Sequence, residues 1–274
     1  MSYSPLTTAE LDRYFARIAY QGSPRADIGT LAALHYLHPL AIPFENLDSW
    51  SGHTPLLDEA AVFTKLVDAG RGGYCFEHNQ LFLRALLALG FNVQTLAARV
   101  IQPGQPLPRT HKVLLIQTGQ GPVLADVGFG GMTMSAPLQL YLRGQQTTPH
   151  EPWQIEADDN EYVTSAQVLG EWSPKFRFSL QPQTTRDYEM ANWYVANHPS
   201  SRFRNDLIAA RVSAAGRHAL LNTRLMFHQH NQGSEQTELG SPAEVAAALN
   251  QVFGINTTAI IGLEQKLAKL FTDS

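Results

Sequence analysis

Cysteine is almost absent from this sequence, which has a single one, Cys75, among 274 residues. A single cysteine excludes an internal disulfide framework and fits a reducing compartment. The N-terminal stretch has neither a basic segment nor an apolar run, so we expect no signal peptide. No uninterrupted apolar run reaches the roughly 18 residues that cross a bilayer. These absences predict a cytoplasmic protein with no membrane partner.

An excess of charge of one sign is also missing. The chain has 20 Lys and Arg against 24 Asp and Glu, interspersed, for a net charge of −4. This balance predicts no surface for nucleic acid or for an anionic membrane. No Gly-x-Gly-x-x-Gly helix start indicates a dinucleotide site. What is present, 44% hydrophobic and 16% charged residues, is ordinary for a folded protein larger than one minimal domain.

Three regions of the chain differ in their pattern. Residues 1–90 are helical in character and begin with a capping box, Thr7 followed by Glu10. Residues 91–186 contain short strand-like runs between Gly, Pro and Gln loops, typical of a small sheet or barrel. Residues 187–274 mix helical and strand-like pieces. The pattern predicts an α+β multidomain protein: a helical domain, a β domain and a terminal α/β domain.

Cys75 lies between the glycine turn 72–73 and an almost wholly apolar segment, 80–89, that predicts a buried helix ended by Gly90. A sulfur at a helix N-terminus is near unpaired N–H groups that favour the thiolate. Most free cysteines are small buried hydrophobes without chemistry. The two glycines, and Arg71 four residues before the sulfur, favour a reactive nucleophile instead.

A thiolate enzyme also needs a base and a group that orients the base. Of the ten histidines, His111 opens the predicted strand 112–116 after a flexible loop. Asp126 interrupts the next apolar run, and a hairpin would bring it beside His111. Taken alone, Asp126 is equally well a turn residue. Because an imidazole N–H would satisfy a buried carboxylate, the sequence predicts a triad of Cys75, His111 and Asp126.

The other histidines are expected to lie at the surface or in the core. Those that stand out are His35, His38, His228 and His230. His78 forms a Cys-x-x-His spacing with Cys75, but the chain has no second cysteine and no suitable histidine pair, so we expect no metal. We expect His78 to pack in the first turn of the helix. As a second imidazole near Cys75, it leaves open which histidine is the base.

Five ordered segments carry a family resemblance over nearly the whole chain: 42–48 (IPFENLD), 71–77 (RGGYCFE), 109–111 (RTH), 125–131 (ADVGFGG) and 187–188 (DY). On these segments the sequence resembles the bacterial arylamine N-acetyltransferases. The resemblance implies a helical N-terminal domain, a central β-barrel and a C-terminal α/β lid, with a papain- or transglutaminase-like triad.

The resemblance also implies an activity and a set of binding residues. The activity is acetyl transfer from acetyl-CoA to arylamines, arylhydrazines or N-hydroxyarylamines through an acetyl-cysteine, with no permanently bound cofactor. The implied walls of the acceptor slot are Phe44, Phe129 and Phe203. The candidates for contact with CoA are Thr110, Gly128, Gly130 and Gly131. Ordinary core packing is the alternative for the three aromatic residues, with equal weight for Phe203.

Polar residues near the motifs have a structural interpretation. Glu45 and Asn46 are expected to fix a bend, and Arg71 and Glu77 to hold geometry as an ion pair or as capping partners. Two other functions stay open. A cysteine hydrolase or a transglutaminase would use the same triad, and a binding protein on this fold would not turn over; acceptor dependence distinguishes them.

Overall fold

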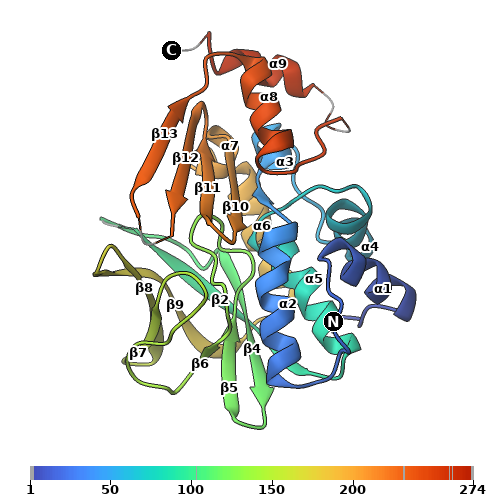
Figure 1. The fold of residues 1–274 in the computed structure, drawn as a ribbon, viewed down its shortest axis with the longest axis vertical. Coiled ribbons are helices and arrows are strands. Elements are labelled where there is room, and N and C mark those ends of the chain that lie inside the picture. The colour runs from blue at the N-terminus through green and yellow to red at the C-terminus, as the bar shows by residue number, and fades with distance from the viewer. Residues whose placement is uncertain (1–2, 103, 231, 259, 261, 273–274) are drawn as a thin grey trace.

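The computed structural model describes residues 3–102, 104–230, 232–258, 260 and 262–272. N-terminal helices pack beside a curved sheet, and a second sheet with the terminal helices lies above it (Figure 1). The first region contains α1 (Thr8–Arg17), α2 (Ile28–Ala41), β1 (Phe44–Glu45), α3 (Leu47–Trp50), α4 (Glu59–Phe63), the π-helix η1 (Thr64–Asp68) and α5 (Cys75–Ala88).

Two helix signals in the sequence are confirmed. Thr7 caps α1 by accepting a hydrogen bond from the Glu10 amide, and the Glu10 carboxylate accepts one from the Thr7 amide at 2.8 Å. The predicted buried helix is α5, whose side chains at 75–86 are all buried. Beyond its end, Gly90 has a φ of +86°, which glycine adopts at little cost. A helix buried on all sides places its first residue, Cys75, inside the molecule.

The curved sheet is antiparallel, in the order β6-β5-β4-β2-β9-β8-β7, with β3 on β2. Its strands are β2 (Asn92–Gln102), β3 (Gln105–Pro106), β4 (His111–Thr118), β5 (Gly121–Ala125), β6 (Leu138–Gln139), β7 (Trp153–Asp158), β8 (Glu161–Val168) and β9 (Glu171–Pro182). β4 is buried on both faces, since Val113 and Leu115 point into the sheet's own core while Leu114 and Ile116 join the core around α5. The barrel therefore presses β4 against the helix that carries Cys75.

Gln146 nearly closes this sheet into a barrel. Its side chain accepts a hydrogen bond from the Gln139 amide at 2.8 Å and donates one to the Gln139 carbonyl at 2.9 Å, on β6. Its backbone pairs with Trp153 at the start of β7. One residue thus connects the two edge strands, which satisfies polar groups that an open edge would expose. The α+β class and the central barrel are confirmed.

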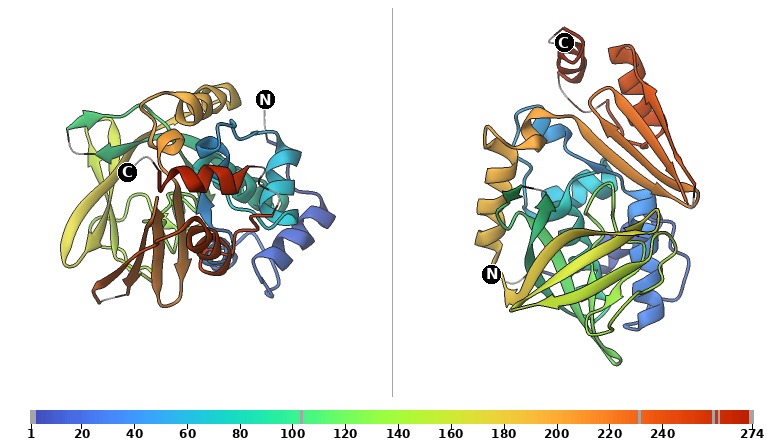
Figure 2. Two further views of the ribbon diagram at one scale, coloured as in Figure 1. Left: turned by 90° about the horizontal axis from the view of Figure 1, so that it is seen from above. Right: turned by 90° about the vertical axis from the view of Figure 1, so that its left-hand side faces the viewer.

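The second sheet has the order β1-β10-β11-β12-β13, and its first strand comes from the N-terminal region. Figure 2 shows this sheet and the terminal helices stacked on one end of the barrel. The last region contains α6 (Thr185–Asn197), α7 (Arg202–Asn205), β10 (Ile208–Ser213), β11 (Gly216–Leu221), β12 (Arg224–Gln229), β13 (Ser234–Glu238), α8 (Pro242–Gln251) and α9 (Leu263–Lys269). Phe44 of β1 pairs with Ala210 of β10, so this sheet contains part of the segment 42–48, one of the five family segments.

Candidate active site

Cys75 is the first residue of α5 and is 8% exposed. The two glycines before it are required by close approach. A Cβ atom at Gly72 would lie 2.1 Å from the Pro43 carbonyl oxygen, and one at Gly73 would lie 2.6 Å from a Glu77 carboxylate oxygen. The Glu45 amide also donates to the Gly73 carbonyl at 2.8 Å. The glycine turn thus packs the chain before Cys75 against the β1 segment.

His111 and Asp126 meet as the hairpin predicts. β4 and β5 pair so that Leu114 lies opposite Ala125, which puts Asp126 just beyond β5. The His111 Nε2 atom is 2.6 Å from the Asp126 Oδ2 atom, and both side chains are buried. The other carboxylate oxygen accepts hydrogen bonds from the Asn79 side chain and the Gly128 amide, each at 2.9 Å. A fully buried carboxylate is therefore satisfied by three donors.

Burial opposes the charged form of both residues, but their pairing outweighs it. Burial raises the pKa of Asp126, whereas the charge and hydrogen bond of His111 lower it, and the net direction is down. Burial lowers the pKa of His111, whereas Asp126 and a hydrogen bond with Cys75 raise it to about 10. Because Asp126 occupies Nε2, Nδ1 is the ring nitrogen left for an interaction with Cys75. The three predicted triad residues lie together, with the imidazole in the middle.

His78 is held in a different chain of hydrogen bonds. Its Nε2 atom donates to the Pro43 carbonyl at 3.1 Å, because a carbonyl can only accept. Its Nδ1 atom then accepts from His38 Nε2 at 2.9 Å, and His38 Nδ1 accepts from the Tyr14 hydroxyl at 2.9 Å. Burial lowers the pKa of His78 to about 4. Both nitrogens of the neutral His78 ring are occupied, so His111 is the histidine that bonds Asp126 and Cys75.

His35 is also a core residue, since its Nε2 atom accepts from the Asp126 amide at 3.1 Å. His35 and His38 are core residues, as expected, although the buried Nδ1 atom of His35 has no hydrogen-bond partner among the described residues. Both lie beside the site, a position that no local pattern of residues indicates.

The residues predicted to form the acceptor slot fall into two groups. Phe44 lies 6.0 Å from Phe203, between ring centroids, and its ring packs on the face of His78. A Cβ atom at Gly130 would be 3.4 Å from the Phe44 ring. Phe129 instead lies 5.1 Å from the His111 ring, at a perpendicular angle. One group of aromatic rings thus packs beside His78 and the other beside His111.

The remaining predicted residues lie close to the sulfur or in open space. The Cys75 sulfur is 3.6 Å from the Thr110 carbonyl oxygen. A Cβ atom at Gly128 would be 3.0 Å from the Cys75 Cα atom, so a side chain there would displace Cys75. A Cβ atom at Gly131 would meet no described atom within 4 Å. Sequence reasoning missed Phe176, whose ring centroid is 5.2 Å from that of His111.

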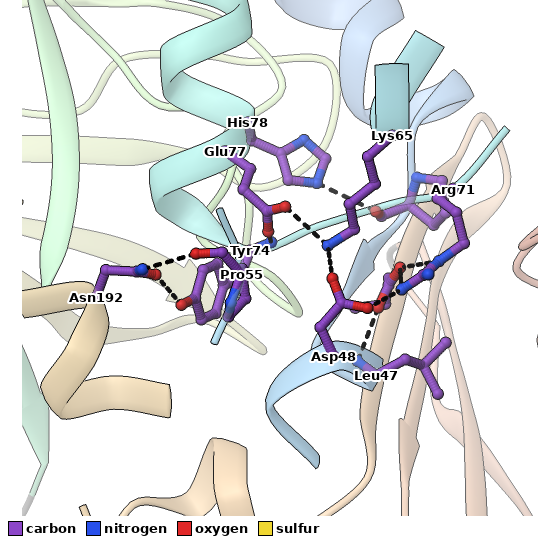
Figure 3. A network of polar contacts seen from close by, with 11 residues as sticks. Leu47, Asp48, Pro55, Lys65, Arg71, Tyr74, Glu77, His78 and Asn192 are labelled. Atoms are coloured by element: carbon purple, nitrogen blue, oxygen red, sulfur yellow. Dashed lines mark hydrogen bonds and ion pairs between the residues drawn. The ribbon is translucent and has the colours of Figure 1, made fainter. Parts of the chain in front are cut away.

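A buried network of charges holds the segment before Cys75 (Figure 3). The Lys65 ammonium lies 2.6 Å from Asp48 and 2.7 Å from Glu77, and the Arg71 guanidinium lies 2.7 Å from Glu45 and 2.9 Å from Asp48. Burial raises the pKa of Asp48, but Lys65 and Arg71 bring it down to about 2. Arg71 and Glu77 therefore belong to one network without pairing with each other.

The carboxylates of this network also bind backbone amides. Glu77 accepts from the Tyr74 amide at 3.0 Å, and Glu45 accepts from the Leu47 amide at 2.7 Å. Asn46 is uncharged. Its side chain donates a hydrogen bond to the Phe203 carbonyl, in the third region of the chain, at 2.8 Å. These contacts fix the turn on either side of Cys75. No local pattern marks Lys65, which lies in the π-helix.

We expect Lys65→Met to lower the free energy of unfolding by about 3–5 kcal/mol, because it leaves Glu77 buried without its cation. Arg186→Met is the matched control. It removes an exposed pair with Glu189 and should cost about 1 kcal/mol or less. Urea unfolding of both variants measures the difference. Equal costs for the two substitutions would contradict a structural role for the network.

Lys112 follows His111, and strand alternation turns its side chain to the opposite face of β4. There it is completely buried, with its ammonium 2.9 Å from the Tyr3 hydroxyl and over the rings of Tyr3 and Tyr188. Within the described residues no carboxylate pairs with Lys112. Burial lowers its pKa to about 7.

Lys112→Met is expected to stabilise the protein by about 1–4 kcal/mol near pH 6, because an unpaired buried cation is replaced by an apolar chain. The folded pKa is about 7 and the ordinary value is 10.5, so wild type gains stability as pH rises between them. The advantage of the variant should therefore shrink towards pH 10. Urea unfolding at both ends of this range, with the exposed Lys269→Met as control, checks it. A stability difference between the variant and wild type that does not change with pH would contradict the lowered pKa of Lys112.

The sequence is similar to those of known N-acetyltransferases. Residues 27–261 match the N-acetyltransferase family model. The chain is 40% identical to the arylamine N-acetyltransferase of Mycolicibacterium smegmatis, over 92% of this chain and 94% of that protein. The chain belongs to the arylamine N-acetyltransferase family. Within the residues described, no helix has the length and apolar character to span a membrane.

Two further arylamine N-acetyltransferase relatives bear on the ligands. The Salmonella typhimurium protein, named arylamine N-acetyltransferase / N-hydroxyarylamine O-acetyltransferase, is 36% identical over 92% of this chain and 91% of its own length. The solved structure of Mycobacterium marinum arylamine N-acetyltransferase in complex with CoA superposes with a TM-score of 0.91 at 37% identity, covering 95% of this chain and 99% of that one. The sequence-based family assignment is confirmed.

Proposed function

We propose that this protein transfers the acetyl group of acetyl-CoA to arylamines and arylhydrazines and to the oxygen of N-hydroxyarylamines. The observation that carries the proposal is the buried His111–Asp126 hydrogen bond, with Cys75 acting on the pKa of His111 from the start of a buried helix, in a chain of this family. The CoA complex of one relative and the two activities in the name of another support the donor and the acceptors. Acetyl-CoA acts as a substrate and no cofactor is permanently bound.

In the first half-reaction Cys75 is acetylated by acetyl-CoA. His111 holds the proton of the Cys75 thiol at Nδ1, and the thiolate attacks the thioester carbonyl, forming a new carbon–sulfur bond. The tetrahedral adduct expels the CoA sulfur, which takes the proton from His111. Acetyl-cysteine and free CoA result. Asp126 stabilises the imidazolium through its 2.6 Å hydrogen bond and fixes which nitrogen faces the sulfur.

In the second half-reaction the acetyl group passes from Cys75 to the acceptor. The acceptor nitrogen attacks the acetyl carbon while His111 removes its proton as general base, a contribution of roughly 10²–10⁴ in rate. The adduct then expels Cys75, and the sulfur recovers the proton from His111. The enzyme returns to its starting state with the acetylated amine released, which gives ping-pong kinetics.

Different residues bind the acceptor and CoA. Phe44, Phe129 and Phe203 form the apolar walls for the aromatic acceptor, and the first and last of these lie in contact. Thr110 and the glycines at 128, 130 and 131 approach CoA. Because the N–H groups of Thr110, Gly128 and Gly130 already donate within the protein, the glycines contribute space for close approach of the ligand.

We also propose that the three sequence regions are domains. They are a helical domain, 1–90, a barrel domain, 91–186, and an α/β domain, 187–274, that acts as the lid. The triad has the papain- or transglutaminase-like arrangement, with the nucleophile on a helix and the base on the barrel. The hydrogen bond from Asn46 to the Phe203 carbonyl supports a lid held over the acceptor slot. A cytoplasmic location is supported by the single cysteine.

Acceptor dependence tests the proposal. Release of CoA from acetyl-CoA is followed with a thiol reagent, with and without an arylamine, and acetylated product is quantified in parallel. Release should rise strongly with the amine and match product formation. Release that is the same without an amine would instead indicate a hydrolase, and acceptance of a lysine peptide in preference to an arylamine would indicate a transglutaminase-like enzyme.

A further inference from the structure

A cavity lies between the C-terminal end of α2 and β10, two elements that are in contact. Its volume is about 340 Å³, and none of the active-site residues described above lines it. Its walls include Leu40 of α2, Arg211 and Ser213 of β10, His218 of β11 and Val252 beyond α8. Side chains alternate along β10, so Arg211 points to the sheet face opposite Ala210, which packs with Phe44 and Cys75. The cavity is therefore separate from the triad.

Two basic side chains converge on this cavity. Arg211 and His218 are directly opposite each other on neighbouring antiparallel strands, and so lie on the same face. The His218 ring also packs against Phe227, with ring centroids 4.5 Å apart and the planes tilted by 49°, which limits its rotation. Gly254 makes room for the arginine, because a Cβ atom there would lie 2.6 Å from one guanidinium nitrogen.

Both side chains have donors that the described protein leaves unused. Arg211 donates from Nε to the Leu40 carbonyl at 3.1 Å, and within the described residues it has no ion pair. Both ring nitrogens of His218 are buried without a hydrogen-bond partner there. Buried donors of this kind cost about 1–3 kcal/mol each unless a ligand or water satisfies them.

The neighbouring groups that shift the pKa values at this pair are basic. Burial, Arg211 and His228 each lower the pKa of His218, and Arg211 also lowers that of Arg17, after burial. Burial alone lowers the pKa of Arg211. The cavity is thus a concave, partly desolvated surface with excess positive charge, which attracts an anion.

We propose that this cavity is a binding site for a phosphate group, held by the guanidinium of Arg211 and the imidazole of His218. An arginine fork matches two oxygens of a phosphate, and His218 donates to a third from the neighbouring strand. The volume exceeds that of the free ion, so inorganic phosphate and a small phosphate monoester both fit. The bound anion satisfies the buried donors and neutralises the charge.

Calorimetric titration of inorganic phosphate into the full chain tests the proposal at constant ionic strength and neutral pH, with sodium chloride as reference. Wild type should bind phosphate saturably. Arg211→Met and His218→Phe should each weaken binding at least about tenfold, since each removes a charge-assisted hydrogen bond. The matched control is Arg224→Met, on an exposed position of β12, which should bind as wild type does.

Two outcomes would overturn the proposal. One is that wild type shows no saturable binding, or that wild type, Arg211→Met and His218→Phe bind phosphate equally. If one of the two variants does not fold, the other still tests the proposal. The second is displacement of phosphate by CoA, which would place the ion in the donor site. A parallel titration with glycerol phosphate distinguishes the sources: tighter binding than inorganic phosphate assigns the site to a monoester, and weaker binding to the free ion.

Discussion

Cys75→Ala should reduce the kcat of acetyl transfer by on the order of 10⁴–10⁶, to a level set by binding of the two substrates alone. Alanine cannot form the acetyl-enzyme, and without it the acceptor must attack acetyl-CoA directly. The substitution removes one buried sulfur, so we expect the variant to fold and to keep its affinity for CoA.

Steady-state kinetics with acetyl-CoA and an arylamine measure the loss, and thermal unfolding confirms the fold. Cys75→Ser is a second variant, because a hydroxyl fits the same space but is far less acidic than a thiol. Retention of more than a few per cent of the activity by the alanine variant would contradict a covalent mechanism.

Asp126→Asn has the second largest expected effect, a loss of about 10³–10⁴ in kcat. The asparagine oxygen can still accept from Asn79 and Gly128, so its amide group faces His111 Nε2. Nε2 must then accept, which puts the proton on Nδ1 of a neutral ring. That proton blocks the nitrogen that has to remove one from the acceptor.

The pH dependence of kcat/KM provides a second readout of Asp126→Asn. In wild type the Asp126 carboxylate raises the pKa of His111 to about 10, so the imidazolium persists until the pH passes that value. Loss of the carboxylate lowers this pKa towards its ordinary value, and the alkaline limb should move to lower pH. Asp158→Asn, in an exposed ion pair with Arg177, is the control. An unchanged limb would contradict the role of Asp126.

Local patterns in the sequence were enough to predict that Asp126 lies beside His111. A strand, a short turn and a second strand determine where Asp126 lies relative to His111, and the hairpin register bears this out. The apolar run after Cys75 predicted a buried helix for the same reason, because burial on all faces removes the polar stripe of a surface helix.

The supporting residues come from distant segments, which no local pattern connects. Lys65 reaches Glu77 from the π-helix, and His38 reaches His78 from α2. Asn79 is a further supporting residue that spacing could have revealed, since it lies one helical turn after Cys75 and so faces the same way. Its side chain spans the Lys112 carbonyl and the Asp126 carboxylate.

The acetyl-cysteine is the central claim, and intact-protein mass spectrometry after mixing with acetyl-CoA, without any amine, tests it most directly. Wild type should gain one acetyl group, Cys75→Ala should gain none, and an arylamine should discharge the adduct with formation of the acetylated amine. An adduct that forms equally on Cys75→Ala, or that survives the arylamine while product still accumulates, would contradict the account.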